Sequence, residues 1–163
     1  MSDSPKPIPL AAANGPVKID ALPWASWGEG DRFGSRVQCL ADSRKGAQIG
    51  VIIEELPPGK QSCPFHYHLL EEEHVMVLEG VVTLRLGDKT FEMSAGDYIR
   101  FPAGEALGHC LINNGDKPCK YLCFGPRNPN EVAVYPDSDK VMVRGLGEIY
   151  QKSATLQYWD GEN

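Results

Sequence analysis

The sequence predicts an all-β protein, built as a barrel or sandwich of short antiparallel strands. Short apolar runs recur at regular spacing and are separated by clusters of turn residues. The chain has 17 glycines and 13 prolines in 163 residues, which favours tight turns over long helices. Apolar residues almost never recur with the period of a helix. Together these observations are typical of β-sandwiches and barrels.

The expected strands follow one another along most of the chain. Pro57-Pro58-Gly59, Gly87-Asp88 and Asn113-Asn114-Gly115-Asp116 mark turns between them. The strands are expected over residues 36–41, 49–56, 73–78, 81–86, 89–92, 98–101, 107–113, 120–124, 131–135, 140–144 and 155–159.

Three regions of different composition divide the chain. Residues 1–34 form an N-terminal arm and cover, in which we expect residues 1–16 to be mobile and Trp24 and Trp27 to cover one end of the domain or a subunit partner. Residues 35–125 are expected to form the barrel core. Residues 126–163 are too few for a second domain, and we expect their strands to complete the outer sheet or to exchange with a second subunit.

Composition excludes several classes of function. The net charge of −6, without a basic cluster, argues against nucleic-acid binding. No apolar stretch approaches the roughly 20 residues of a membrane span, and no secretory signal is recognisable, so we expect a cytoplasmic protein. Five cysteines without a CxxC motif are expected to be reduced thiols, although Cys63 lies close enough to His66 to be a softer alternative metal ligand.

A candidate metal site begins at His66 and His68. Residues at i and i+2 of a strand point to the same face, so both imidazoles can enter one cavity. A carboxylate from the run of three glutamates at 71–73 can meet them at the start of the next strand. Two imidazoles and a carboxylate suit a first-row divalent metal. His109 and His74 are the two remaining histidines.

Two stretches of the sequence resemble the cupin superfamily. Gly59, His66, His68, Glu73 and Gly80 resemble its first motif. The second motif is resembled by Gly96, Pro102, Gly104, His109 and Asn113. Six residues rather than five separate Gly59 from His66, and four rather than two separate Gly104 from His109, so both departures fall in turns.

The resemblance implies a cupin-type double-stranded β-helix, or jelly roll, with one divalent metal held by His66, His68, Glu73 and His109. Glu73 is favoured because six residues separate it from Gly80, and Glu72 is the alternative. If Glu73 points inward, then His74 points away, and Glu71 is expected on a solvated face. The donor set does not distinguish Fe, Mn, Ni, Co, Cu and Zn.

Three functions remain open at this stage. The first is a small metal-dependent enzyme, of dioxygenase, isomerase or lyase type, acting on a small polar or anionic molecule. The second is a barrel that binds a sugar or carboxylate without turnover, and the third is a structural or regulatory partner protein. A homodimer is the expected assembly, because sheet edges and exposed aromatics invite sheet extension.

The residues that could serve the substrate are few. Tyr67 is expected to point outward from between two inward histidines, and Tyr98 could donate a proton or simply pack. Arg100 could clamp an anion or face solvent, whereas Glu105 lies at a rim turn and is uninformative.

Overall fold

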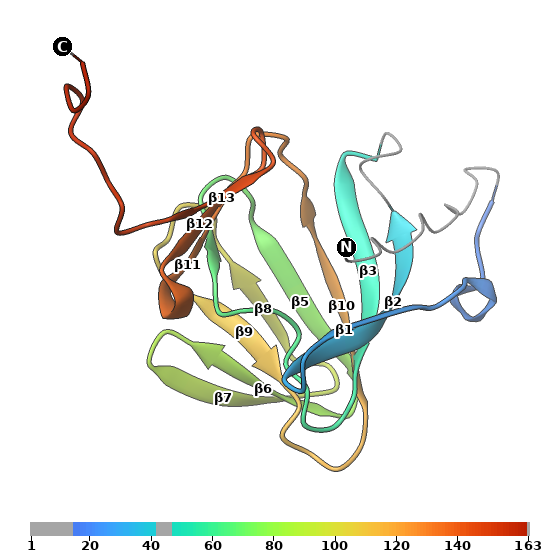
Figure 1. The fold of residues 1–163 in the computed structure, drawn as a ribbon. Helices are drawn as coiled ribbons and strands as arrows, with labels where there is room; N and C mark the ends of the chain where they lie inside the picture. Colours follow the sequence, from blue (N-terminus) through green and yellow to red (C-terminus); the bar gives the residue numbers. More distant parts are fainter. Residues whose placement is uncertain (1–14, 42–46, 163) are drawn as a thin grey trace.

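The fold is all-β and forms a jelly-roll barrel (Figure 1). A computed structural model describes residues 15–41 and 47–162. Within this part the strands are β1 (Ala25–Glu29), β2 (Phe33–Ala41), β3 (Ile49–Leu56), β4 (Tyr67–His68), β5 (Glu73–Glu79), β6 (Val81–Leu86), β7 (Lys89–Ser94), β8 (Tyr98–Phe101), β9 (His109–Ile112), β10 (Cys119–Pro126), β11 (Val132–Tyr135), β12 (Lys140–Val143) and β13 (Glu148–Gln151). Two short 3₁₀ helices, η1 (Ile19–Ala21) and η3 (Pro136–Ser138), complete the elements.

The largest sheet has six strands in the order β1-β2-β3-β10-β5-β8. All five pairs of neighbouring strands in this sheet are antiparallel. The facing layer consists of the three-stranded sheet β7-β6-β9, and a four-stranded sheet β13-β12-β11-β4 lies beside it. Figure 1 shows β11, β12 and β13 together at one end of the molecule, and β11 pairs with β4.

The hydrophobic core fills the space between the six-stranded sheet and the β7-β6-β9 sheet. Val75 and Val77 of β5 point inward and pack with Val82 and Leu84 of β6. Burying an aliphatic side chain of this size contributes about 1.5–3 kcal/mol. Glu73 lies two residues before Val75 on the same face, so β5 carries a carboxylate at one end of the barrel and apolar side chains at the other.

The C-terminal strands join the barrel through β4. Ala133 of β11 pairs with His68, and Val134 pairs with Tyr67. The loop from 69 to 72 also comes close to β10, where a Cβ added at Gly125 would lie 2.2 Å from the Glu72 carbonyl oxygen. A residue larger than glycine cannot occupy this position without moving the loop.

Most of the expected strands lie within two residues of those observed, but the two ends of the chain differ. The strand predicted at 155–159 is wrong: residues 155–157 are irregular and 158–159 begin a turn. Leu156, Tyr158 and Trp159 are highly exposed. Instead, β13 extends the sheet at Glu148–Gln151. The strand β1, which contains Trp27 and pairs with β2, was not among the expected strands. The arm expected at residues 1–16 lies almost wholly outside the described residues.

In the described part of the chain, no helix is long and apolar enough to cross a membrane.

Candidate metal centre

Three histidines and one glutamate meet at the end of the barrel opposite the apolar core. His68 belongs to β4, Glu73 begins β5 and His109 begins β9. His66 is held by an isolated antiparallel bridge, in which its amide donates to the His109 carbonyl at 3.1 Å and the His109 amide donates back at 2.8 Å. Backbone pairing therefore positions each of these four residues, which we call the histidine cluster.

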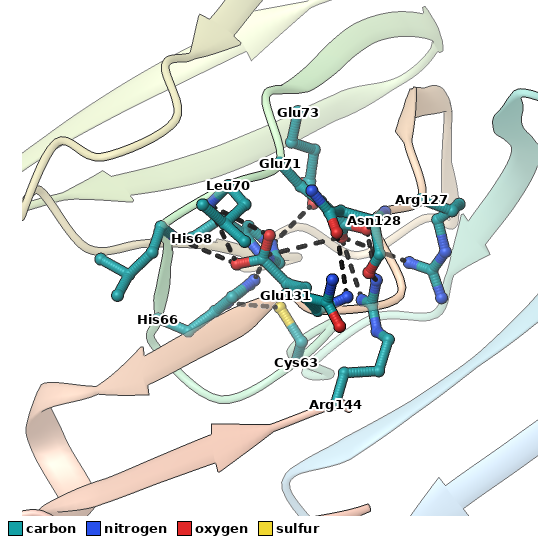
Figure 2. Close-up of polar contacts among 12 residues, drawn as sticks. Cys63, His66, His68, Leu70, Glu71, Glu73, Arg127, Asn128, Glu131 and Arg144 are labelled. Atoms are coloured by element: carbon teal, nitrogen blue, oxygen red, sulfur yellow. Dashed lines mark hydrogen bonds and ion pairs between the residues drawn. The ribbon is translucent and has the colours of Figure 1, made fainter. Parts of the chain in front are cut away.

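The donor atoms of the histidine cluster face one another. Nε2 of His66 lies 3.0 Å from Nε2 of His68. The two carboxylate oxygens of Glu73 lie 3.5 Å from Nε2 of His68 and 3.6 Å from Nε2 of His109. One donor atom from each of the four residues lies within 4.8 Å of the others. Figure 2 shows His66, His68 and Glu73 converging in this way.

Two aromatic rings hold the histidine planes in place. Phe101 of β8 stacks on His109 with ring centres 3.7 Å apart, and Tyr135 of β11 stacks on His66 at 5.8 Å. Nδ1 of His66 lies 2.9 Å from the Pro64 carbonyl oxygen. Since a carbonyl only accepts, this nitrogen carries the proton and Nε2 presents its lone pair to the cluster.

Several buried nitrogen atoms of the cluster lack a hydrogen-bond partner among the described residues. These are both ring nitrogens of His109, whose Nε2 faces Glu73 without a hydrogen bond, and Nδ1 of His68, which lies on the Glu131 side of its ring. Buried polar atoms in proteins are normally paired, and an unpaired one costs about 1–3 kcal/mol. Three imidazoles and a carboxylate with unused lone pairs fit a divalent transition metal.

The pKa shifts of His66 and Glu73 favour the protonation states that a metal requires, whereas the shift of His68 favours its protonated form. Burial, with the charges of neighbouring histidines, lowers the pKa of His66 to about 4, so it is neutral near pH 7. Burial alone would raise the pKa of Glu73, but its contacts with His109 and His68 hold it well below the usual value. Burial also lowers the pKa of His68, but the carboxylates around it outweigh this effect and the net pKa is raised.

The neighbouring Glu72 points away from the cluster. Its carboxylate contacts Nε2 of His74 at 2.8 Å and the Arg100 guanidinium at 3.0 Å. His74 in turn contacts the Tyr98 hydroxyl at 2.6 Å and stacks on Phe124. The structure therefore brings Glu73, rather than Glu72, into the cluster, and it places His74 outside.

Cys63 also lies outside the cluster. Its sulfur is 3.6 Å from Nδ1 of His66, the ring nitrogen that faces away from the other donors. Burial raises the pKa of the Cys63 thiol, so the thiolate that binds metals is disfavoured. All five cysteines lie in the described part of the chain and none forms a disulfide.

Glu71 is not on a solvated face, which corrects the expectation from sequence. It is 3% exposed and forms a bidentate ion pair with Arg144. The backbone amide of Asn128 donates to the same carboxylate at 2.5 Å. A run of glutamates is usually solvated, but here the chain returns and covers Glu71 with residues from after β10.

A second buried carboxylate, Glu131, supports the same loop. The Leu69 amide donates to Oε1 at 2.9 Å, and the Leu70 amide donates to Oε2 at 3.1 Å. Oε1 also lies 3.4 Å from Nδ1 of His68, on the side of the ring away from the cluster. We call Glu71, Glu131 and Arg144 the carboxylate network (Figure 2). Sequence reasoning missed the roles of all three residues.

Glu54 and Tyr121 occupy the barrel interior near the cluster. Glu54 accepts a 2.5 Å hydrogen bond from Ser35, and burial raises its pKa. Burial also raises the pKa of Tyr121 well above its usual value, so its hydroxyl stays protonated. Both groups are buried, and burial disfavours the ionised form of each.

Two hollows reach the cluster from different sides. The larger has a volume of about 310 Å³ and is lined by residues that include Ile52, His68, Glu73, Phe124 and Arg127. The smaller, of about 210 Å³, is lined by residues that include Tyr67, Arg100, Leu107 and His109. Glu105 also lies on the wall of the smaller hollow.

Comparison with known proteins agrees with this architecture. Residues 52–125 match the model of the cupin domain family, and these residues include all four members of the histidine cluster. The chain therefore contains a cupin domain. No protein of curated function matches it.

Solved structures similar to this cupin span most of its length. A sugar phosphate isomerase of the cupin superfamily from Silicibacter pomeroyi is 29% identical, with a TM-score of 0.74, over 90% of this chain and 98% of that protein. A protein from Acidithiobacillus ferrooxidans proposed to be a sugar phosphate isomerase is 28% identical, with a TM-score of 0.71, over 76% of this chain and 80% of that one. A predicted oxalate decarboxylase from Thermotoga maritima is 19% identical, with a TM-score of 0.61, over 70% of this chain and all of that one, and supports the fold alone.

Proposed function

We propose that this cupin binds one divalent transition metal through His66, His68, Glu73 and His109, and uses it to isomerise a small polar or anionic molecule. The observation that carries the proposal is the convergence of three imidazoles and a carboxylate, with an unpaired Nε2 on His109. Two members of this cluster, His68 and Glu73, line a cavity of about 310 Å³. A pocket of this size is at the lower end of those that hold small ligands.

The choice of isomerase chemistry rests on the similar structures. Two proteins whose names include sugar phosphate isomerase are 28–29% identical to this chain. A bound metal supplies Lewis-acid polarisation of a hydroxyl or carbonyl oxygen. The protein's own residues orient the donors: Pro64 keeps the proton of His66 on Nδ1, and Phe101 fixes the plane of His109.

Metal analysis tests the first half of the proposal. The protein, purified without a tag or chelator, is expected to hold about one equivalent of metal. His68→Ala should lower occupancy at least about 10-fold, because it removes one donor of four. His74→Ala is the matched control, since it removes a histidine outside the cluster, and it should retain the metal. Equal occupancy in both variants, or no uptake by the wild type, would contradict the proposal.

Turnover tests the second half. The metal-loaded protein is incubated with a panel of aldose and ketose phosphates, and NMR spectra are followed for conversion between isomers. Conversion that disappears in His68→Ala supports the isomerase. If the metal-loaded protein converted none of the sugars in the panel, the proposed isomerase activity would be contradicted.

Binding without turnover is the second candidate function. One observation favours it: Glu71 and Glu72, which line the larger hollow beside the cluster, are both engaged in ion pairs. They are therefore not unpaired bases waiting for a substrate proton. Calorimetry that detects a bound sugar or carboxylate, together with unchanged ligand by NMR, would favour this candidate over the enzyme.

A further inference from the structure

Arg127 lies at the wall of the larger hollow, in which His68 and Glu73 also take part. It follows the end of β10, and its side chain is about half exposed. We propose that Arg127 anchors the anionic group of the ligand while the histidine cluster receives its hydroxyl or carbonyl end. This inference rests on the proposed function and names the substrate class: a small molecule with a phosphate or carboxylate remote from its metal-binding oxygens.

The charges around Glu71 leave Arg127 with its positive charge largely unused. Glu71 already forms a bidentate ion pair with Arg144. The Asn128 amide occupies the same carboxylate at 2.5 Å. Arg127 approaches Glu71 only to 4.0 Å, at the limit of an ion pair. One carboxylate thus faces two guanidinium groups, and the more exposed of the two has the weaker contact.

Packing holds the Arg127 stem beside the hollow. A Cβ built at Gly50 of β3 would lie 3.2 Å from both Cγ and Cδ of Arg127, so the missing side chain leaves room for the arginine to lie against the strand. Gly50 lines the same hollow. The guanidinium group is therefore carried on a supported stem rather than on a side chain extending into solvent.

Arg100, another arginine near the cluster, lacks these properties. Arg100 lines the smaller hollow, and its guanidinium contacts Glu72 at 3.0 Å. Its charge is already matched by that carboxylate. Since a guanidinium binds phosphate or carboxylate through parallel hydrogen bonds, the less committed Arg127 is the better anion anchor.

Ligand binding to the full-length, metal-loaded protein tests the inference. Calorimetry compares fructose 6-phosphate, fructose and inorganic phosphate as probes, and metal content is measured on every sample. We expect the phosphorylated sugar to bind more tightly than fructose. Arg127→Gln should weaken its binding about 10- to 100-fold, the loss expected for a charge-assisted contact. Arg127→Lys should recover part of this loss, and the affinity for fructose should be unchanged.

Two further variants make the test specific. Arg100→Gln is the matched control and should leave phosphate-sugar binding unchanged. Gly50→Ala keeps the charges of Arg100 and Arg127 but displaces the Arg127 stem. It should therefore weaken binding of the phosphorylated probe and leave binding of fructose unchanged. Metal affinity and thermal stability should be unchanged in Arg127→Gln, which separates an anion anchor from a structural residue.

Some outcomes would overturn the inference. These are equal binding of the phosphorylated probe by the wild type and Arg127→Gln, a loss in Arg100→Gln instead, or no preference for the phosphorylated probe over fructose in protein that holds its metal. Failure of the proposed metal site is recognised separately, because the wild-type samples would then contain no metal.

Discussion

The histidine cluster and the carboxylate network lie side by side at the loop from 69 to 72, but they differ in how far their polar atoms are hydrogen-bonded. In the cluster, both ring nitrogens of His109 lack hydrogen-bond partners among the described residues. In the network, the Glu71 carboxylate is filled by Arg144 and the Asn128 amide. Unpaired donors in a buried site indicate room for a ligand, whereas a satisfied network indicates a support.

A second group of potential metal ligands illustrates the difference between unpaired and satisfied polar atoms. His68, Glu71 and Glu131 also lie close enough together to hold an ion. However, both carboxylates are already occupied, by Arg144 or by backbone amides of the loop. A cation there would face the guanidinium of Arg144 and compete with these bonds, so the proximity of acidic groups alone does not make a metal site.

Removing Arg144 should have the largest effect on stability, because it leaves the buried Glu71 carboxylate without its ion pair. The four residues of the histidine cluster are unchanged. Arg144→Met leaves the buried Glu71 charge with only the distant Arg127, and we expect a loss of about 3 kcal/mol in unfolding free energy. Urea denaturation measures it.

Two comparisons sharpen this prediction. Adding Glu71→Gln to Arg144→Met should restore much of the stability, since the uncompensated charge is then gone. Arg100→Met, which removes an exposed ion pair, should cost less than about 1 kcal/mol. If Arg144→Met were no more destabilising than Arg100→Met, the network would not be a structural support.

Glu131 connects the two regions, and its neutralisation should have an intermediate effect. Its Oε1 lies 3.4 Å from Nδ1 of His68, opposite the nitrogen that faces the cluster. A carboxylate behind a metal-binding histidine orients the ring and increases its basicity. Glu131→Gln should therefore lower metal affinity about 10-fold. Competition with a chelating dye measures this, and Glu148→Gln on the exposed strand β13 is the control. Equal metal affinities of the wild type and Glu131→Gln would show that Glu131 does not support metal binding by His68.

The sequence predicted the residues of the cluster because their signals are local. His66 and His68 are two residues apart, so strand geometry places them on one face. His109 was one of only two further histidines, and its motif resembled that of a known family. The strands at 49–56, 81–86 and 98–101 were likewise predicted with their observed bounds, because turn residues flank them.

The carboxylate network could not be predicted in this way. Arg144 is 73 residues from Glu71 along the chain, and no local pattern relates them. Glu71 looked solvated because the segments that cover it return only after β10. The missed β13 and the wrong strand at 155–159 have a similar cause: both segments carry apolar residues, but only Glu148–Gln151 has a neighbouring strand, β12, to pair with.

Glu54 gives the smallest expected effect and extends the comparison to a third buried carboxylate. Burial raises its pKa above that of the unfolded chain. The folded state therefore binds the proton more tightly, and this contribution to stability is lost as the pH rises through the folded pKa. Glu54→Gln can still accept the Ser35 hydrogen bond without ionising. For metal-free protein, we expect the stability of the variant relative to the wild type to increase by about 1 kcal/mol as the pH rises from 5 to 8. Urea denaturation at both pH values measures the gain, with Glu92→Gln on β7 as an exposed control. Parallel pH profiles for the wild type and Glu54→Gln would mean that the interior keeps Glu54 ionised, by charges that compensate its burial as Arg144 does for Glu71.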